Sequence, residues 1–398
     1  EQSFGNVDPS SATMNLVLLG LRGPAANLLW MELDHYKDTK NWSRMLSTTN
    51  SIILLQPHFQ KVWVFNGWNL AFNVSMEWDD VRDRYYWVKE GAKFFKLGTK
   101  RNQRFSELYW YTGDTLGKKI GNSDEKDFFR QFFKKDPDKK FTVNDEDGPD
   151  RELNPEGKDN FEVAREWFLQ SVDVHKDPKG VKEHIMADAL FYGYPARADF
   201  DRGVAWLREG VFSQEPWNRG FEYWTGAYGQ EPVSLNVPGT NRDITIHLEW
   251  KPEDIKNEKG EEAPLFMYWV ERYQSMCNYR YWRVRGLAER EQNTVESHKE
   301  LYEAGQALLK GDTPDAEKKA YSGLEKFEKM TQAHPTLLED DLTIEDAMIG
   351  LLIWREAYKY NHKEDYPAQF PMREVWVKQQ PSLMEFERTF LRKFNTNR

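Results

Sequence analysis

The chain of 398 residues has little cysteine, no long apolar run and no excess of positive charge. Cys277 is its only cysteine, so no disulfide can form within one chain and a cysteine-based zinc site is excluded. Because no run of about 18 apolar residues occurs, the sequence predicts no membrane-spanning helix. Lys and Arg number 55 against 65 Asp and Glu, a net charge of −10. Nucleic-acid binding favours a basic patch, so we expect no nucleic-acid partner.

The sequence also lacks the common catalytic motifs. Its eight histidines form no pair at the spacing of metal ligands. No P-loop, dinucleotide fingerprint, Gly-x-Ser-x-Gly or His-Glu-x-x-His motif occurs. We therefore predict a protein that is not an enzyme, with no catalytic residue, no cofactor, no metal site and no small-molecule substrate.

Aromatic side chains are abundant instead, with 16 Trp, 18 Tyr and 24 Phe. Each ring buries a large area, so this composition is typical of a core in which rings hold helices together. The alternative is an exposed surface of rings that stacks on sugars. A chain so rich in aromatic residues is also unlike a disordered one.

The segment Trp63-Val-Phe-Asn-Gly67-Trp-Asn-Leu70 indicates a repeat of two helices. In a tetratricopeptide-type unit of about 34 residues, an aromatic residue, a small residue and an apolar residue occupy positions 4, 8 and 11 of the first helix, and proline follows the second. Pro57 then ends the preceding unit. The pattern recurs, and its residues are Tyr109, Gly113 and Leu116, with Phe129, Phe132 and Pro137 in the second helix, and later Gly305, Ala320, Leu324, Phe327 and Pro335.

The patterns divide the chain into four parts. Residues 1–137 are predicted to be an N-terminal helical-repeat region, and residues 138–160 an acidic, solvated linker or loop. Residues 161–265 form a helical region in which the alternation of apolar and polar residues over 232–250 predicts a hairpin or extended arm. Residues 266–398 are a C-terminal helical-repeat region that begins with one long helix and ends in a capping tail. The predicted fold class is mostly α, a tetratricopeptide-like α-solenoid.

The sequence resembles the tetratricopeptide-repeat superfamily. It is similar in particular to uncharacterised repeat proteins of planctomycete-like bacteria, which often follow an N-terminal membrane anchor. The segments that carry this similarity are Leu21-Arg-Gly-Pro-Ala-Ala-Asn-Leu-Leu-Trp30, Leu55-Gln-Pro-His-Phe59, Val62-Trp-Val-Phe-Asn-Gly-Trp-Asn-Leu-Ala-Phe-Asn-Val-Ser75 and Tyr194-Pro-Ala-Arg197. The resemblance implies a helical scaffold outside the cytoplasmic membrane. It also implies that a segment upstream of residue 1 could tether the scaffold to that membrane.

Residues at positions 5, 9 and 13 of the first helices are expected on the concave face of a solenoid, where partners bind. Asparagines on the same helix form either a polar ladder for an extended peptide or hydrogen bonds to a facing helix. A further candidate lies in a loop expected at 191–197. The predicted partner-binding residues are Val64, Trp68, Asn69, Phe72, Asn73, Trp110, Asp114 and Arg197.

The function predicted from these observations is a non-enzymatic scaffold that tethers or organises the subunits of a larger complex, with other protein subunits as its partners. The alternative is a helical protein that binds or cleaves glycans, which requires exposed rings beside two carboxylates. Candidate acids for this alternative are Glu77, Asp79 and Asp80 beside Trp78, and Glu222 beside Trp224.

Overall fold

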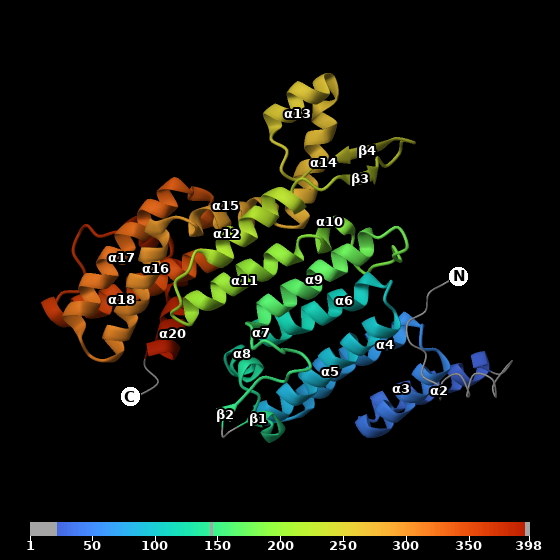
Figure 1. Ribbon diagram of the computed structural model, residues 1–398. Helices are drawn as coiled ribbons and strands as arrows, with labels where there is room; N and C mark the ends of the chain where they lie inside the picture. Colours follow the sequence, from blue (N-terminus) through green and yellow to red (C-terminus); the bar gives the residue numbers. More distant parts are fainter. Residues whose placement is uncertain (1–21, 144–145, 395–398) are drawn as a thin grey trace. The chain divides into compact units, whose positions relative to one another are not determined.

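The computed structural model describes residues 22–143 and 146–394, and helices make up most of these ranges (Figure 1). The prediction of a mostly helical fold with packed neighbouring helices is confirmed. The segment 1–21, with the expected tether before it, lies outside the described residues. Among the described helices, none is long and apolar enough to cross a membrane.

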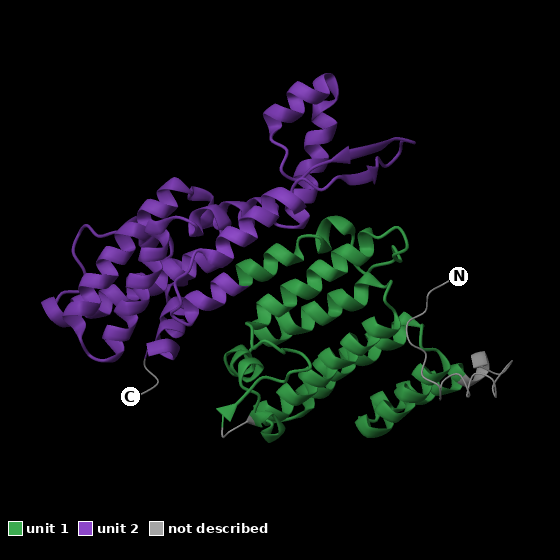
Figure 2. Ribbon diagram, in the orientation of Figure 1, with its two compact units in different colours: residues 1–201 green, residues 202–398 purple. Residues whose placement is uncertain are grey.

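The chain forms two units, residues 1–201 and 202–398 (Figure 2). The finer division into four parts stays a prediction. The helices of the first unit include α2 (Arg22–Asp38), α3 (Trp42–Leu55), α4 (Gln60–Trp68), α5 (Val81–Arg101), α6 (Ser106–Asp114), α7 (Ile120–Asn122), α8 (Lys126–Lys134), α9 (Asn160–Lys176) and α10 (Asp188–Phe191), and α11 (Tyr194–Arg208) continues into the second unit.

The same turn precedes α4 and α6. Gln56 and Asn102, which end α3 and α5, have φ and ψ of −134° and 63° and of −132° and 60°. In each turn a phenylalanine N–H then donates to that residue's carbonyl at 3.1 Å, from Phe59 and from Phe105. The two turns therefore share one local geometry.

The aromatic residues at position 4 fix this turn in both hairpins. The indole N–H of Trp63 donates to the carbonyl of Pro57 at 3.0 Å. The hydroxyl of Tyr109 donates to the equivalent carbonyl of Gln103 at 3.3 Å. In each case the ring packs in the hairpin while its polar tip holds the connection, which gives a physical reason for an aromatic residue with a polar tip at this position.

The glycines at position 8 allow two helices to approach closely. A Cβ on Gly67 would lie 2.5 Å from the ring of Phe95 in α5, and a Cβ on Gly113 would lie 2.8 Å from the ring of Phe168 in α9. The helix that packs along α6 is therefore α9. The prediction that the segment of Phe129 fills this place was wrong, because α8 is short and places that ring against Tyr85 of α5, 5.6 Å between centroids.

The acidic segment between α8 and α9 includes η4 (Lys139–Phe141), β1 (Thr142–Val143) and β2 (Glu146–Asp147), which pairs antiparallel with β1. The prediction that residues 138–160 are solvated was wrong for two carboxylates, Asp150 and Asp159, and Asp136 just before this range is buried as well. Asp136 and Asp150 are buried against Lys89 of α5, 2.7 and 3.5 Å from its Nζ atom, and Asp159 is buried against Arg130 at 2.9 Å. A buried cation requires such counter-ions, so this segment packs on the helices rather than projecting into solvent.

The second unit contains a helical bundle and a small appendage. Its elements include α12 (Glu215–Glu222), η5 (Tyr223–Tyr228), β3 (Val233–Asn236), β4 (Asp243–Ile246), α13 (Pro252–Lys259), α14 (Ala263–Met276), α15 (Tyr279–Glu289), α16 (Gln292–Leu309), α17 (Thr313–Ala333), η7 (Pro335–Glu339), α18 (Asp341–His362), α19 (Arg373–Lys378) and α20 (Leu383–Phe394).

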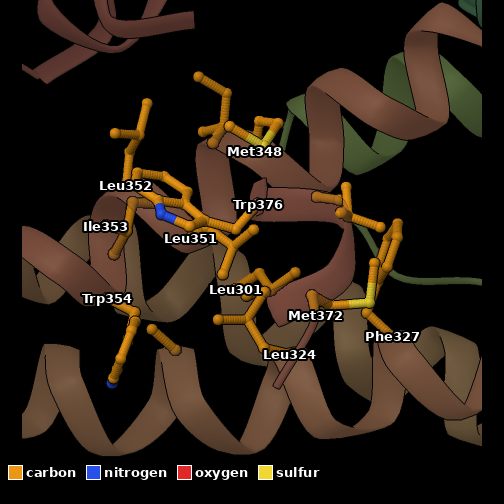
Figure 3. Packing of buried hydrophobic residues seen from close by; sticks show 14 of the residues in the cluster. Leu301, Leu324, Phe327, Met348, Leu351, Leu352, Ile353, Trp354, Met372 and Trp376 are labelled. Carbon is orange, nitrogen blue, oxygen red and sulfur yellow. The ribbon is translucent and has the colours of Figure 1, made fainter. Parts of the chain in front are cut away.

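The bundle core lies among α16, α17 and α18 (Figure 3). Helices α19 and α20 pack against it. Leu301, Leu324 and Phe327 meet Trp354 and Trp376 there. In the appendage, β3 and β4 pair antiparallel within the segment where alternation predicted a hairpin or arm, and their apolar residues pack on α13 and α14.

The single long helix predicted from Phe266 is three helices, α14, α15 and α16. The first break is at Asn278, whose φ of 54° and ψ of 39° lie in the left-handed region. Asparagine tolerates this conformation better than most residues, and one such residue ends a helix. The apolar periodicity continues across the break, which is why the pattern alone did not reveal it.

Candidate functional site

Most of the predicted partner-binding residues lie on α4 and α6 and on the π-helical segments that continue them. α4 continues into η1 (Asn69–Asn73), and α6 into η3 (Thr115–Lys119). The two π segments contact one another. Single π-helical turns are rare and frequently occur at functional sites. We call the area formed by Trp68, Phe72, Asn73 and Lys119 the η1–η3 surface.

An aromatic pair stands at the centre of the η1–η3 surface. The rings of Trp68 and Phe72 stack with centroids 3.9 Å apart and an angle of 14°, and Trp68 remains 41% exposed. Tyr111 of α6 meets the indole edge to face at 6.3 Å. The Nζ atom of Lys119 lies 5.4 Å from the Phe72 centroid, a cation–π contact. Burial lowers the pKa of this lysine, with Glu125 opposing the shift.

The asparagines bond mainly within their own helix. The Asn69 amide donates to the Phe65 carbonyl at 2.8 Å, and Asn73 donates to the Asn69 side-chain oxygen at 2.6 Å. Asn69 is buried and Asn73 is exposed. Asn69 therefore orients Asn73, which presents its remaining polar atoms to solvent. Val64, one row earlier, is half-buried.

Trp110 and Asp114 are on the equivalent row of α6, but they are only 5% and 4% exposed. The Trp110 ring packs edge to face against Tyr194 at 5.3 Å and against His184 at 5.9 Å. Arg197 is in the first turns of α11, not in a loop as predicted. The reason is that Pro195 is the second residue of this helix, where a missing N–H breaks no hydrogen bond.

The ionised form of the Asp114 carboxyl is disfavoured because the side chain is buried. Burial raises the pKa of this carboxyl to about 6, with the cation of Lys118 opposing the shift. Burial, together with the charge of Asp114, raises the pKa of the Tyr194 hydroxyl to about 12. The Asp114 carboxyl therefore takes up a proton at a higher pH than an exposed aspartate does, and its protonated form can donate a hydrogen bond.

Two buried nitrogens have no hydrogen-bond partner among the described residues: the indole nitrogen of Trp110, on the same helix as Asp114, and Nε2 of His184. Burial lowers the pKa of His184 to about 4, so the ring is neutral at pH 7. Its Nδ1 accepts the backbone N–H of Met186 at 3.0 Å, which assigns the proton to Nε2. Both groups are therefore hydrogen-bond donors.

The structure adds Tyr111, Lys119, His184 and Tyr194 to the residues found from the sequence. Tyr111 directly follows the predicted residue Trp110, and Lys119 lies in the π-helical segment η3, where the helical spacing that was used to choose positions no longer holds. His184 and Tyr194 come from a later segment that packs on α6, and no local signal in the sequence marks that contact.

Two of the acids proposed for glycan chemistry, Glu77 and Asp80, have other bonds. Glu77 forms an ion pair with Lys40 at 2.8 Å, and Asp80 caps α5 by accepting the Arg82 N–H at 2.7 Å. Trp224 is fully buried against Tyr279, with ring centroids 5.2 Å apart, so it offers no sugar platform.

No group of three metal-ligating side chains lies close enough to hold an ion within the described ranges. Comparison of the chain with protein-family models, with curated proteins and with solved structures finds no match in any of the three.

Proposed function

We propose that the first unit is a non-enzymatic, tetratricopeptide-like binding module that holds a segment of another protein on the η1–η3 surface. The observation that carries this proposal is the stacked pair of Trp68 and Phe72. An exposed indole leaves apolar area in water, and burying it against a partner recovers that area. Tryptophan and tyrosine dominate the binding energy of protein interfaces, because one rigid ring fills a pocket at little entropic cost.

The repeated hairpin supports the helical-repeat part of the proposal. The turns before α4 and α6 share one backbone geometry, and a π segment follows each of these helices, which supports their equivalence as first helices of two units. Stacked hairpins that expose one row per unit bind extended partners in other repeat proteins.

The wider proposal is that the chain organises the subunits of a larger assembly outside the cytoplasmic membrane. Its support is the resemblance of the sequence to anchored repeat proteins. A helical scaffold needs no reaction of its own, so its function would be tested by what it holds.

The first test is to purify the tagged chain from its native membranes under mild salt. We expect a stoichiometric protein partner that is lost with Trp68→Ala. The matched control is Tyr86→Ala, because Tyr86 lies in the same unit with the same 41% exposure but on α5. A photo-crosslinking residue at each position should join the partner only from position 68. A clean monomer, or equal loss from both variants, would contradict the proposal.

A further inference from the structure

A pocket with a volume of about 770 Å³ opens on another part of the first unit, between α2 and the start of α4. Its volume is within the range of ligand sites, roughly 300–1,000 Å³. None of the partner-binding residues predicted from the sequence lines this pocket. Its lining consists of Asn27, Trp30, Gln56, His58, Phe59, Lys61 and Phe65.

Three rings form the apolar part of this pocket. Trp30 meets Phe59 edge to face at 6.1 Å and 89°, and meets Phe65 at 5.7 Å and 73°. Phe59 is 42% exposed, so part of this apolar lining is in contact with water. Rings held at right angles leave a recess into which one flat or branched side chain fits, and its burial there is favourable.

The polar part of the lining is positive or neutral. Lys61 supplies an ammonium group, Asn27 and Gln56 supply amides, and no carboxylate is among the lining residues. His58 places Nδ1 3.1 Å from the carbonyl of Arg101. Lys61 is also close enough to Glu107 to oppose the rise that burial causes in the pKa of this carboxyl. Glu107 is not a lining residue, and it already accepts a hydrogen bond from the Gln60 amide.

The start of α4 adds to this positive potential. Phe59 is the residue before the helix and provides no side-chain cap, and Lys61 is in its first turn. The partial positive charge of a helix N-terminus favours anions within about one turn. Rings, an ammonium group and this helix end therefore face one pocket.

We infer that this pocket binds an acidic polypeptide segment that inserts one aromatic side chain. The ring would pack against Trp30, Phe59 and Phe65, and flanking carboxylates would pair with Lys61. The whole chain has a net charge of −10, which repels acidic peptides in general. A preference for an acidic segment would therefore have to come from this local site. The inference is independent of the η1–η3 surface.

The test uses three peptides on the full chain: Glu-Asp-Phe-Asp-Glu, Lys-Lys-Phe-Lys-Lys and Glu-Asp-Ala-Asp-Glu, each with blocked ends. Binding is followed by NMR through the indole N–H of Trp30, assigned with Trp30→Phe. We expect saturable binding of the acidic phenylalanine peptide, at least about fivefold tighter than either other peptide.

Variants connect this preference to the pocket. Lys61→Glu should reverse the order of the acidic and basic peptides, whereas Lys100→Glu, an exposed residue of α5 outside the lining, should leave it unchanged. Circular dichroism confirms that each variant folds. The inference is overturned if the Trp30 signal does not saturate, if the basic peptide binds as tightly, or if Lys61→Glu leaves the order unchanged. Because this test reads Trp30 and the previous one reads Trp68, either can fail alone.

Discussion

Lys89 provides the sharpest test of what holds the first unit together. Its side chain is 1% exposed in the middle of α5, and its Nζ atom lies 2.7 Å from Asp136 and 3.5 Å from Asp150. Asp150 also pairs with Lys93 at 2.7 Å. Replacing Lys89 with methionine keeps most of the side-chain volume but leaves Asp136 buried without its cation.

We expect Lys89→Met to lower the free energy of unfolding by about 3–5 kcal/mol, the usual effect of removing one partner from a buried ion pair. Whole domains have only about 5–15 kcal/mol, so this is a large fraction. The double variant Lys89→Met with Asp136→Asn should recover part of the loss, since it removes the unpaired charge. Lys100→Met, an exposed lysine on the same helix, should change stability by less than about 0.5 kcal/mol.

The assay is urea unfolding combined with hydrogen exchange of peptides from α5 and from the 135–159 segment, because the two units need not unfold together. We expect Lys89→Met to increase exchange in both peptides, and protease cleavage near residue 147 to accelerate. A loss below about 1 kcal/mol, or a double variant less stable than Lys89→Met alone, would refute the argument that the carboxylates are held as counter-ions.

Three further predictions concern single positions. A Cβ on Gly91 would lie 2.8 Å from the backbone of Gly67, so Gly91→Ala should lower the free energy of unfolding by about 1–3 kcal/mol. A Cβ on Gly226 would meet open space, so Gly226→Ala should raise it by about 0.5–1 kcal/mol. Thermal unfolding measures both variants. Asn278→Ala should destabilise by about 1–2 kcal/mol and Asn278→Gly by far less. Because the folded pKa of Asp114 is raised to about 6, this carboxyl should make the free energy of unfolding decrease as the pH rises from about 4 to 6. Asp114→Asn should flatten this slope and add about 3 kcal/mol at pH 7.

Local patterns predicted the first helices α4 and α6 of two hairpins in the first unit. Trp63 and Tyr109 mark equivalent positions because each ring has a polar tip that reaches the preceding turn. Gly67 and Gly113 mark close helix contacts because any Cβ there would overlap a ring. These signals act within one hairpin or between neighbouring helices, so they are visible at fixed spacing in the sequence.

Contacts between distant segments could not be predicted in the same way. Tyr194 and His184 pack on Trp110 from a segment that begins more than one helix later, and no spacing rule relates them. The predicted row of exposed residues on α6 was therefore covered, and the candidate site moved toward Trp68 and Phe72. Periodicity indicates which face of a helix is apolar, but it does not indicate what packs on it.

The charges of the 135–159 segment show why composition was misleading. A stretch rich in Asp and Glu with Gly and Pro is typical of a solvated loop, and in isolation it would be one. Asp136 and Asp150 are buried because α5 places Lys89 on its packed face, and a lysine there is stable only with counter-ions. The same carboxylates hold the chain against α5 between α8 and α9, and α9 then packs along α6, which is not its neighbour in sequence.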